Sequence, residues 1–407
     1  MEVLIPEKKR KRKSKPTTTT TKTKKKKKLE KPSSTPQQST PNPIPSLPDD
    51  LVFHIIARIS RLYYPTLSLV SKSFRSLLAS PELYKTRSLL GRTESCFYLC
   101  LKSECCKGGP SWFTLCRKPD QTITNDETSG ERKSRGYALA KVPLSQSPNA
   151  NFSSLVAVGS NIYNIGVPQS IYKASSSTVS VLDCTSHTWR QAPSLPVELF
   201  RLSASVLDRK IYVAGRYADG DDSNNMKNTF QVFDTRTQVW DHEPIPEDGL
   251  YFSNSACIDG KFHLVANVAA YNAKEGRWDI LGKSGMSRYM DTDTHCDIEN
   301  VLYSFSDGAL RWYDSEVREW RILNGLVGLP KFRPGAWVGL ADYGGKMMVL
   351  WAETAGALVF YQKRIWCAEI TLERRKSCEI WGKVEWFGHV LTVSADCNFQ
   401  KVIAATV

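Results

Sequence analysis

The sequence has no long uninterrupted apolar run. Its longest clearly apolar stretch, Met347 to Ala352, is far shorter than the about 20 residues that a helix needs to cross a membrane. The first residues are charged and are not followed by the apolar core of a secretory signal. These two absences predict a protein without a membrane partner that stays inside the cell, in the nucleus, the cytoplasm or both.

Motifs for metal binding and covalent catalysis are also missing. The six histidines are dispersed, and none of the eleven cysteines forms a CxxC pair, although five crowd between residues 96 and 116. Zinc and copper sites need clustered imidazole or thiolate ligands, and the sequence has neither a phosphate-binding glycine loop nor a nucleophile motif. An odd number of cysteines without a secretory signal favours reduced thiols. We therefore expect no cofactor, no bound metal and no catalytic residue, and a protein that is not itself an enzyme.

Acidic residues are scarce in the first 31 positions, which hold 14 lysines and arginines against three glutamates. The remaining chain has 41 basic and 38 acidic residues, so most of the formal net charge of +14 lies in this segment. Repulsion between these charges and the scarcity of apolar side chains predict that residues 1–44 form a disordered tail.

The first basic cluster of the tail is a predicted nuclear-import signal, because an extended array of lysine and arginine suits an acidic groove. Its residues are Lys8, Lys9, Arg10, Lys11, Arg12 and Lys13. Two alternatives remain open: direct binding of nucleic acid through the tail, and a solvated tail without a binding role. No aromatic residue interleaves the charges to stack on bases, which argues against the nucleic-acid alternative.

Residues 45–90 have the pattern of a small helical domain. Apolar residues repeat at helical spacing in two stripes, one from Leu51 to Ile59 and one from Val70 to Leu78, and Pro65 separates them. A unit of about forty residues buries too little apolar surface to fold well alone. Part of its apolar face should therefore contact another surface, which implies a partner.

The same segment resembles an F-box, whose pattern is Leu-Pro, an acidic residue, an apolar helix, a proline, and then Val-Ser-Lys-x-aromatic-Arg-x-Leu. The matching residues are Leu47, Pro48, Asp50, Leu51, Ile55, Ile59, Pro65, Leu67, Leu69, Val70, Ser71, Lys72, Phe74, Arg75 and Leu77. The resemblance implies docking on the Skp-type adaptor of a Skp, cullin and F-box ubiquitin ligase. The implied adaptor contacts are Leu47, Pro48, Leu51, Ile55, Ile59, Pro65, Leu67, Val70, Phe74 and Leu77. The alternative is a helical hairpin that simply packs on the following domain.

From about residue 95 onward, the chain repeats an apolar strand that ends in a turn and is followed by a tryptophan. The six tryptophans are Trp112, Trp189, Trp240, Trp278, Trp320 and Trp381, on average about 54 residues apart, close to the kelch period of about 50. The pattern resembles the kelch repeat, and together with the F-box it resembles the plant-type F-box/kelch-repeat family. The resemblance implies a mainly β fold, a kelch-type β-propeller over residues 95–407 with six blades, preceded by a small all-α F-box.

The two ends of the predicted propeller are incomplete units. The hairpin from Phe97 to Trp112 has no strands before it, and two apolar segments near the C-terminus, residues 389–393 and 401–405, have no tryptophan hairpin after them. We expect both segments to join the hairpin at residues 96–116 in one blade, because an open propeller would expose unpaired strand edges. Two short tryptophan steps, of 38 and 42 residues, indicate blades that are short or lack an edge strand.

By the same resemblance, the chain is the substrate-recognition subunit of the ligase, and its propeller holds a target protein for ubiquitination. Catalysis by proximity needs no acid, base or nucleophile from the receptor. Loops at one end of the propeller are the natural target surface. The candidate target contacts are Arg201, Arg216, Tyr217, Tyr251, Arg288 and Arg333. Two alternatives stay open: a propeller enzyme, and a basic-tailed nuclear or nucleic-acid-binding scaffold.

Overall fold

The computed structural model describes residues 44, 47–105, 108–118, 136–167, 175–218, 226–245, 254–265, 269–280, 285–290, 294–333, 336–355, 362–376 and 378–407. The predicted import signal at residues 8–13 lies outside these residues. So does Tyr251, one of the candidate target contacts.

The first part of the described chain is a small helical domain. Its helices are α1 (Asp49–Ala57), the short 3-10 helix η1 (Arg61–Tyr63), α2 (Tyr64–Leu67), α3 (Lys72–Leu78) and α4 (Pro81–Leu89). Serine side chains begin two of the α-helices: Ser71 Oγ accepts the Phe74 N–H at 3.1 Å, and Ser80 Oγ accepts the Leu83 N–H at 3.3 Å. The helices enclose one apolar core, formed by Val52, Ile56, Ala57, Tyr64, Leu77, Leu78 and Leu83.

The rest of the chain is built from strands, with two further 3-10 helices, η2 (Phe152–Ser154) and η4 (Met286–Tyr289). The strands are β1 (Ser95–Ser103), β2 (Ser111–Arg117), β3 (Tyr137–Lys141), β4 (Leu155–Val158), β5 (Asn161–Ile165), β6 (Val179–Asp183), β7 (Thr188–Ala192), β8 (Arg201–Leu207), β9 (Lys210–Ala218), β10 (Met226–Asp234), β11 (Val239–Glu243), β12 (Ser255–Ile258), β13 (Lys261–Leu264), β14 (Ala269–Asn272), β15 (Arg277–Ile280), β16 (His295–Ile298), β17 (Val301–Ser306), β18 (Ala309–Asp314), β19 (Glu319–Ile322), β20 (Val338–Asp342), β21 (Met347–Ala355), β22 (Gln362–Lys376), β23 (Glu379–Ser394) and β24 (Cys397–Thr406).

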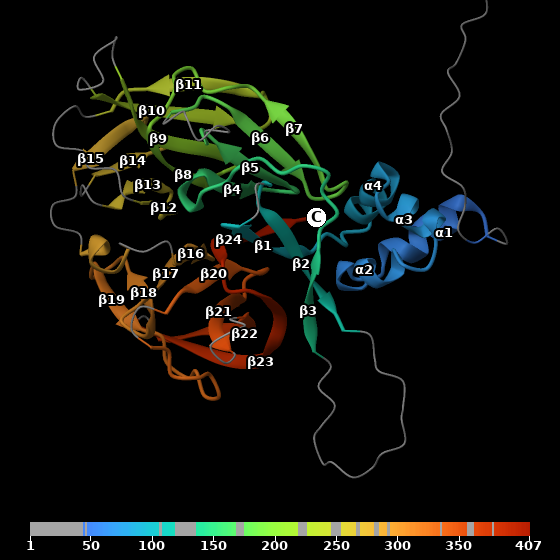
Figure 1. Ribbon diagram of the computed structural model, residues 1–407. Helices are drawn as coiled ribbons and strands as arrows, with labels where there is room; N and C mark the ends of the chain where they lie inside the picture. Colours follow the sequence, from blue (N-terminus) through green and yellow to red (C-terminus); the bar gives the residue numbers. More distant parts are fainter. Residues whose placement is uncertain are drawn as a thin grey trace, which may run out of the picture. The chain divides into compact units, whose positions relative to one another are not determined.

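These strands form six antiparallel sheets of four strands each, arranged as the blades of a propeller (Figure 1). The predicted six-bladed propeller behind a small all-α domain is confirmed. The blades with the short tryptophan steps were expected to be short or to lack an edge strand. The first of them is short, since every strand of β12 to β15 has four residues, and the alternative of a missing edge strand is wrong. Both blades with the short tryptophan steps, β12 to β15 and β16 to β19, have all four strands.

The first blade has the strand order β24-β1-β2-β3, so the end of the chain supplies its innermost strand. In this pairing Tyr98 lies opposite Ile403, and the backbones of Glu94 and Val407 exchange two hydrogen bonds of 2.9 Å. One of the two predicted C-terminal segments, residues 401–405, therefore lies in the first blade. Because the last strand, β24, pairs with the first strand, β1, no unpaired strand edge is left where the ring of blades closes.

The other predicted segment, residues 389–393, does not join the first blade. It is the second half of β23, which pairs along β22 over its whole length with three register shifts, so no turn separates residues 389–393 from Trp381. The fourth strand of the first blade is β3 instead. Trp112 is consequently in the third strand of its blade, whereas the other five repeat tryptophans are in fourth strands.

Three of the repeat tryptophans tie their blade to the connection that enters it. The Nε1–H of Trp240 donates to the Pro193 carbonyl at 2.9 Å, and that of Trp278 donates to the Pro244 carbonyl at 2.7 Å. Trp320 donates in the same way to Met286, at 3.1 Å. Each of these three tryptophans satisfies a carbonyl of irregular backbone. The buried Nε1–H groups of Trp189 and Trp381 have no hydrogen-bond partner among the described residues.

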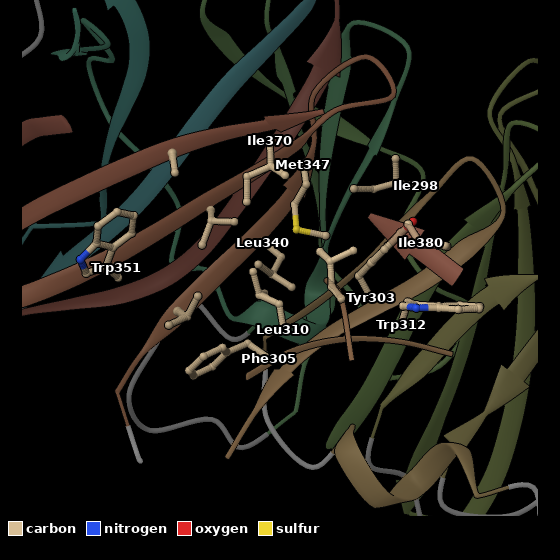
Figure 2. Packing of buried hydrophobic residues seen from close by; sticks show 14 residues of the cluster. Ile298, Tyr303, Phe305, Leu310, Trp312, Leu340, Met347, Trp351, Ile370 and Ile380 are labelled. Atoms are coloured by element: carbon tan, nitrogen blue, oxygen red, sulfur yellow. The ribbon is translucent and has the colours of Figure 1, made fainter. Parts of the chain in front are cut away.

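Apolar side chains from neighbouring blades interlock to form the core. Figure 2 shows this packing between the fifth and sixth blades, where Leu310 lies beside Leu340, and Trp312 lies toward Ile380. Strands with neighbours on both faces bury residues at successive positions rather than at alternate ones. The same reason accounts for the unbroken apolar runs of the inner strands.

The two ends of the propeller differ in their connections. Because successive strands of a blade are antiparallel, the turns between first and second strands lie at the same end as those between third and fourth strands. These turns are short in the second to sixth blades, as at Asp208–Arg209, and this end is called the turn end. The first blade differs, because residues 118–136 join its third and fourth strands. Most of the longer links, between second and third strands and from blade to blade, lie at the opposite end, called the loop end, although β17 and β18 are joined there by the short turn Asp307–Gly308.

Candidate functional site

The helical domain leaves a set of large apolar side chains uncovered. Apart from Leu89 at the end of α4, they are Leu51, Ile55, Tyr63, Leu69 and Val70, and this exposed apolar set includes Leu51 at 51% and Leu69 at 78% exposure. Helix α1 explains part of the set, because the helix has two apolar stripes. Val52 and Ile56 face the core, whereas Leu51 and Ile55 lie one position earlier and remain exposed. A domain this small does not leave five such residues exposed by chance packing, so the set is a candidate docking surface.

The residues predicted to contact an adaptor divide into three groups by burial. Leu51, Ile55, Val70 and Pro48 are exposed, and Leu47, Ile59, Pro65, Leu67 and Phe74 are half-buried. Leu77 is 3% exposed and belongs to the helical core, so the structure removes it from the docking surface. In helix α3, both Leu77 and Leu78 face the core. The apolar stripe from Val70 to Leu78, read from the sequence, does not distinguish these buried residues from the exposed ones.

Tyr63 and Leu69 were absent from the predicted contacts. Leu69 lies just beyond the C-cap of α2, in the turn that leads to α3, where the backbone no longer follows one helical period. The sequence signal that could have identified Leu69 as a contact is its position directly before Val70, as a second apolar residue in the turn. Tyr63 gave no comparable signal, because a tyrosine is found at both buried and exposed positions.

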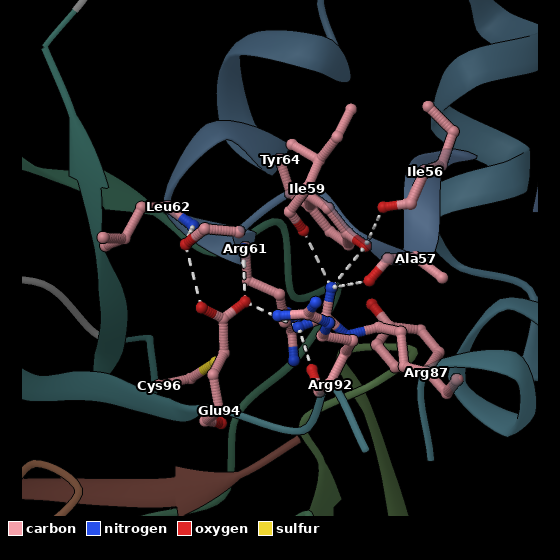
Figure 3. A network of polar contacts seen from close by, with 12 residues as sticks. Ile56, Ala57, Ile59, Arg61, Leu62, Tyr64, Arg87, Arg92, Glu94 and Cys96 are labelled. Atoms are coloured by element: carbon pink, nitrogen blue, oxygen red, sulfur yellow. Dashed lines mark hydrogen bonds and ion pairs between the residues drawn. The ribbon is translucent and has the colours of Figure 1, made fainter. Parts of the chain in front are cut away.

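A network of buried charges holds the helical domain together (Figure 3). Arg87 of α4 is 2% exposed. Its Nη1 donates to the carbonyls of Ala57 and Ile59 at 3.1 and 2.8 Å and to the Tyr64 hydroxyl at 3.1 Å. Its Nη2 is 2.7 Å from Glu94 Oε1. The guanidinium thereby satisfies the last carbonyls of α1, which a helix leaves without partners.

Glu94 links this network to the first strand of the propeller. Its Oε1 also accepts the backbone N–H of Arg61, and its Oε2 accepts the Ser60 hydroxyl at 2.8 Å. Arg61 in turn reaches the second blade, where its Nη2 donates to the Cys184 carbonyl at 2.9 Å. The helical domain and the turn end of the propeller are therefore joined by direct, buried hydrogen bonds.

The described candidate target contacts all lie toward the loop end. Arg201 begins β8 opposite Arg216 near the end of β9, and Tyr217 follows it. Arg288 is in η4 and Arg333 is in the link between the fifth and sixth blades. Arg201, Arg288 and Arg333 are exposed, whereas Arg216 and Tyr217 are half-buried. The order of the strands explains why these residues lie toward the loop end. Each of them is near the start or end of a strand at the loop end, or in a link between two blades.

A narrow cavity of about 290 Å³ lies among the innermost strands of all six blades. Asp297, Asp342 and Lys401 are among its lining residues. Burial, together with the charge of Asp342, raises the pKa of Asp297. The Lys401 ammonium lies 3.4 Å from the centre of the Phe152 ring and donates to the Phe152 carbonyl at 3.2 Å.

Within the described ranges, no group of three or more His, Cys, Asp or Glu side chains has a metal-binding arrangement. In that same part of the chain, none of the helices has the length and apolar character that crossing a membrane requires.

Comparison with known proteins gives two domain matches. A family model described as the F-box domain matches residues 44–86, and one described as the FKB95, Kelch-repeats domain matches residues 112–391. F-box/kelch-repeat protein At5g51250 of Arabidopsis thaliana is 59% identical over 374 residues, covering 89% of this chain and 99% of the relative. F-box/kelch-repeat protein At3g08810 of the same plant is 53% identical over 377 residues, covering 90% of this chain and 95% of the relative.

The fold and these matches point to an adaptor-type receptor rather than an enzyme, with a helical F-box domain carried on a propeller. The chain belongs to the F-box/kelch-repeat family. An F-box implies a Skp-type adaptor as one partner, and a kelch propeller implies a target protein as the other.

Proposed function

We propose that this protein is the substrate-recognition subunit of a Skp, cullin and F-box ubiquitin ligase. Its F-box docks on a Skp-type adaptor, and its propeller binds the target protein. The observation that carries the proposal is the exposed apolar set, which lies within the F-box match at residues 44–86 and has no covering surface among the described residues. Burying such side chains in an interface contributes about 1.5–3 kcal/mol each before the costs of association.

The receptor contributes geometry rather than chemistry in this scheme. A target held at the propeller is kept near a ubiquitin-charged enzyme, so its lysines react at a high effective concentration. The direct hydrogen bonds between the F-box and the propeller support this role, because they keep the two binding surfaces in a defined relation. No acid, base or nucleophile of the chain takes part.

Substitution of Leu51 by Asp tests the docking. The change places a charge in an interface that the proposal makes apolar, so the affinity for a purified Skp-type adaptor should fall at least about a hundredfold. Titration calorimetry measures the affinity. Leu51 is exposed, so the melting temperature should stay within a few degrees.

Ile280→Asp is the matched control, because Ile280 is an 86% exposed isoleucine in β15 of the propeller. The control should bind the adaptor like the unchanged protein. Equal adaptor binding by the Leu51 and Ile280 variants would remove the basis of the proposal.

We also propose that the basic tail directs import into the nucleus. The support is the concentration of charge in the first 31 residues, which carry 14 lysines and arginines. Imaging of a fluorescent fusion with and without residues 1–31 tests this proposal. Loss of nuclear signal on deletion is the expected result, whereas an unchanged distribution rejects it. If the tail instead binds nucleic acid, the deletion will abolish a steeply salt-dependent affinity.

A further inference from the structure

A second cavity, of about 570 Å³, lies between the F-box and the first blade. Leu62, Pro65 and Leu69 line it from the helical side, and Phe97, Leu115 and Ala138 line it from β1, β2 and β3. Most of its walls are apolar. Its size is within the range of about 300–1,000 Å³ that is typical of sites for small organic ligands.

The buried charges beside this cavity do not balance. Arg61 and Arg87 are 8% and 2% exposed. The carboxylate of Glu94 pairs with the guanidinium of Arg87, whereas from Arg61 it accepts the backbone N–H. The oxygens of Glu94 already accept from Arg61 N, Arg87 Nη2 and Ser60 Oγ. A buried cation without a matching anion is costly, and a ligand anion would relieve this cost.

Arg61 is the buried one of the cations that line the cavity. The side chain lies within 5.8 Å of the centres of the Tyr64 and Tyr84 rings, and its Nη1 has no hydrogen-bond partner among the described residues. The carbonyl of Cys184 accepts its Nη2 but carries no full charge. The guanidinium is therefore held in place by the fold while its charge remains unpaired.

The other ionisable groups of the lining add to the positive character. Arg75, Arg117 and Lys141 also line the cavity, and Glu94 is the one carboxylate among the described lining residues. Burial, and then the charge of Arg61, lower the pKa of His187 to about 4, so this imidazole is neutral near pH 7. The cavity thus joins apolar walls to an excess of cationic groups.

We propose that this cavity binds a small amphipathic carboxylic acid, with the carboxylate at Arg61 and the apolar part against the β1–β3 wall. Such a ligand would contact both the F-box and the first blade and would stabilise their relative orientation. The neighbouring chain segment 119–135 is a poor occupant for the cavity, because its sequence holds a single isoleucine among mainly polar residues. The proposal is independent of adaptor docking.

Fluorescence titration of the full-length protein with dansyl-labelled undecanoic acid and with its methyl ester tests the proposal. The acid should bind with a dissociation constant in the micromolar range, and the uncharged ester about tenfold more weakly. Arg61→Gln should remove the preference for the acid over the ester. Arg58→Gln, at an exposed arginine of the same domain, should retain it.

A second variant, Ala140→Trp, fills the cavity from β3 without touching the charge network. It should weaken both probes about tenfold or more, which keeps the test valid if the Arg61 variant fails to fold. Equal binding of acid and ester by the unchanged protein would overturn the proposal, as would full acid binding by Ala140→Trp. A third variant, in which a short glycine-serine link replaces residues 120–134, tests whether this chain segment is the occupant instead. Much tighter probe binding by this variant would show that the segment fills the cavity, and would also overturn the proposal.

Discussion

Glu94 is the residue through which the F-box and the propeller share one buried charge network. Its carboxylate faces Arg87 and the backbone of Arg61, and its own backbone is bonded to Val407 in the closing strand. A single side chain thus contributes to a helix cap, an ion pair and the junction between two domains. Interactions of this kind are cooperative, so the loss of one partner affects all of them.

Replacement of Glu94 by Gln is expected to lower the free energy of unfolding by about 2–4 kcal/mol, because the buried guanidinium of Arg87 loses its anion. The side chain of Glu94 is 29% exposed, so water relieves part of the cost. Equilibrium unfolding in urea measures the change. Glu82→Gln, at an exposed position in the first turn of α4, is the control and should differ from the unchanged protein by less than about 0.5 kcal/mol. Equal losses in both variants would contradict this account.

His187 gives stability a dependence on pH at the same junction. Burial is the larger cause and the charge of Arg61 the second, and together they lower the pKa of His187 to about 4. An unfolded chain has a histidine pKa of about 6.5, so the unfolded state binds the proton more readily. The contribution is present above about pH 6.5 and is lost as the pH falls toward 4.

The unfolding free energy of the unchanged protein should therefore decrease by about 1–3 kcal/mol more than that of His187→Gln between pH 6.5 and 4. Urea unfolding at several pH values measures the difference. His54→Gln, at an exposed position of α1, should show the same pH dependence as the unchanged protein. Parallel curves for the unchanged protein and the His187 variant would exclude this role.

At the scale of elements, the repeat of the sequence depends on a few local rules that recur in each blade. A short turn joins the first two strands, and a tryptophan of the fourth strand donates to the incoming connection in three of the blades. The first blade departs from the rule because its strands come from both ends of the described chain. Its Trp112 is in the third strand and donates to Ser147 Oγ at 3.0 Å instead.

Deletion of residues 401–407 is expected to lower the melting temperature by more than about 10 °C or to prevent folding. The deletion removes the buried side chains of Val402, Ile403 and Ala405 and exposes the edge of β1. Circular dichroism during heating measures the effect. Deletion of residues 1–31 should leave the melting temperature unchanged. A truncated protein that melts with the unchanged one would show that β24 is not needed for closure.

At the scale of the whole molecule, the two proposed binding surfaces are separated along the chain and in space. The F-box is bonded to the turn end of the propeller, whereas the described candidate target contacts lie toward the loop end. A partner on one surface therefore leaves the other accessible. This separation is what a receptor needs in order to bind adaptor and target together.

The double variant Arg201→Glu with Arg288→Glu should reduce capture of target proteins about tenfold and leave adaptor affinity unchanged. Proximity labelling with the proteasome blocked measures target capture, and titration calorimetry measures adaptor binding. Arg236→Glu, at an exposed position of the turn end, is the control and should capture targets normally. Unchanged capture by the double variant would exclude the two arginines from the target surface.

Local patterns were sufficient to predict the domain types but not every strand or contact. The tryptophan repeat predicts six blades because each copy uses the same turn and strand signals. The fate of residues 389–393 was not predictable in this way, because a long bulged strand and two short strands have the same local pattern. Likewise, Leu51 and Leu77 both belong to helical stripes, and their different burial depends on which face meets the rest of the domain.

The sequence by itself determined the helical F-box, the blade repeat and the location of the excess positive charge, because these follow from local spacing and composition. The tertiary structure alone decided which apolar residues remain exposed, which strand completes the first blade, and how Arg61, Arg87 and Glu94 come together. These features depend on contacts between residues distant in the chain, such as Arg61 with Cys184 and Glu94 with Val407. No local period encodes such contacts, since they form only when all six blades and the F-box pack at once.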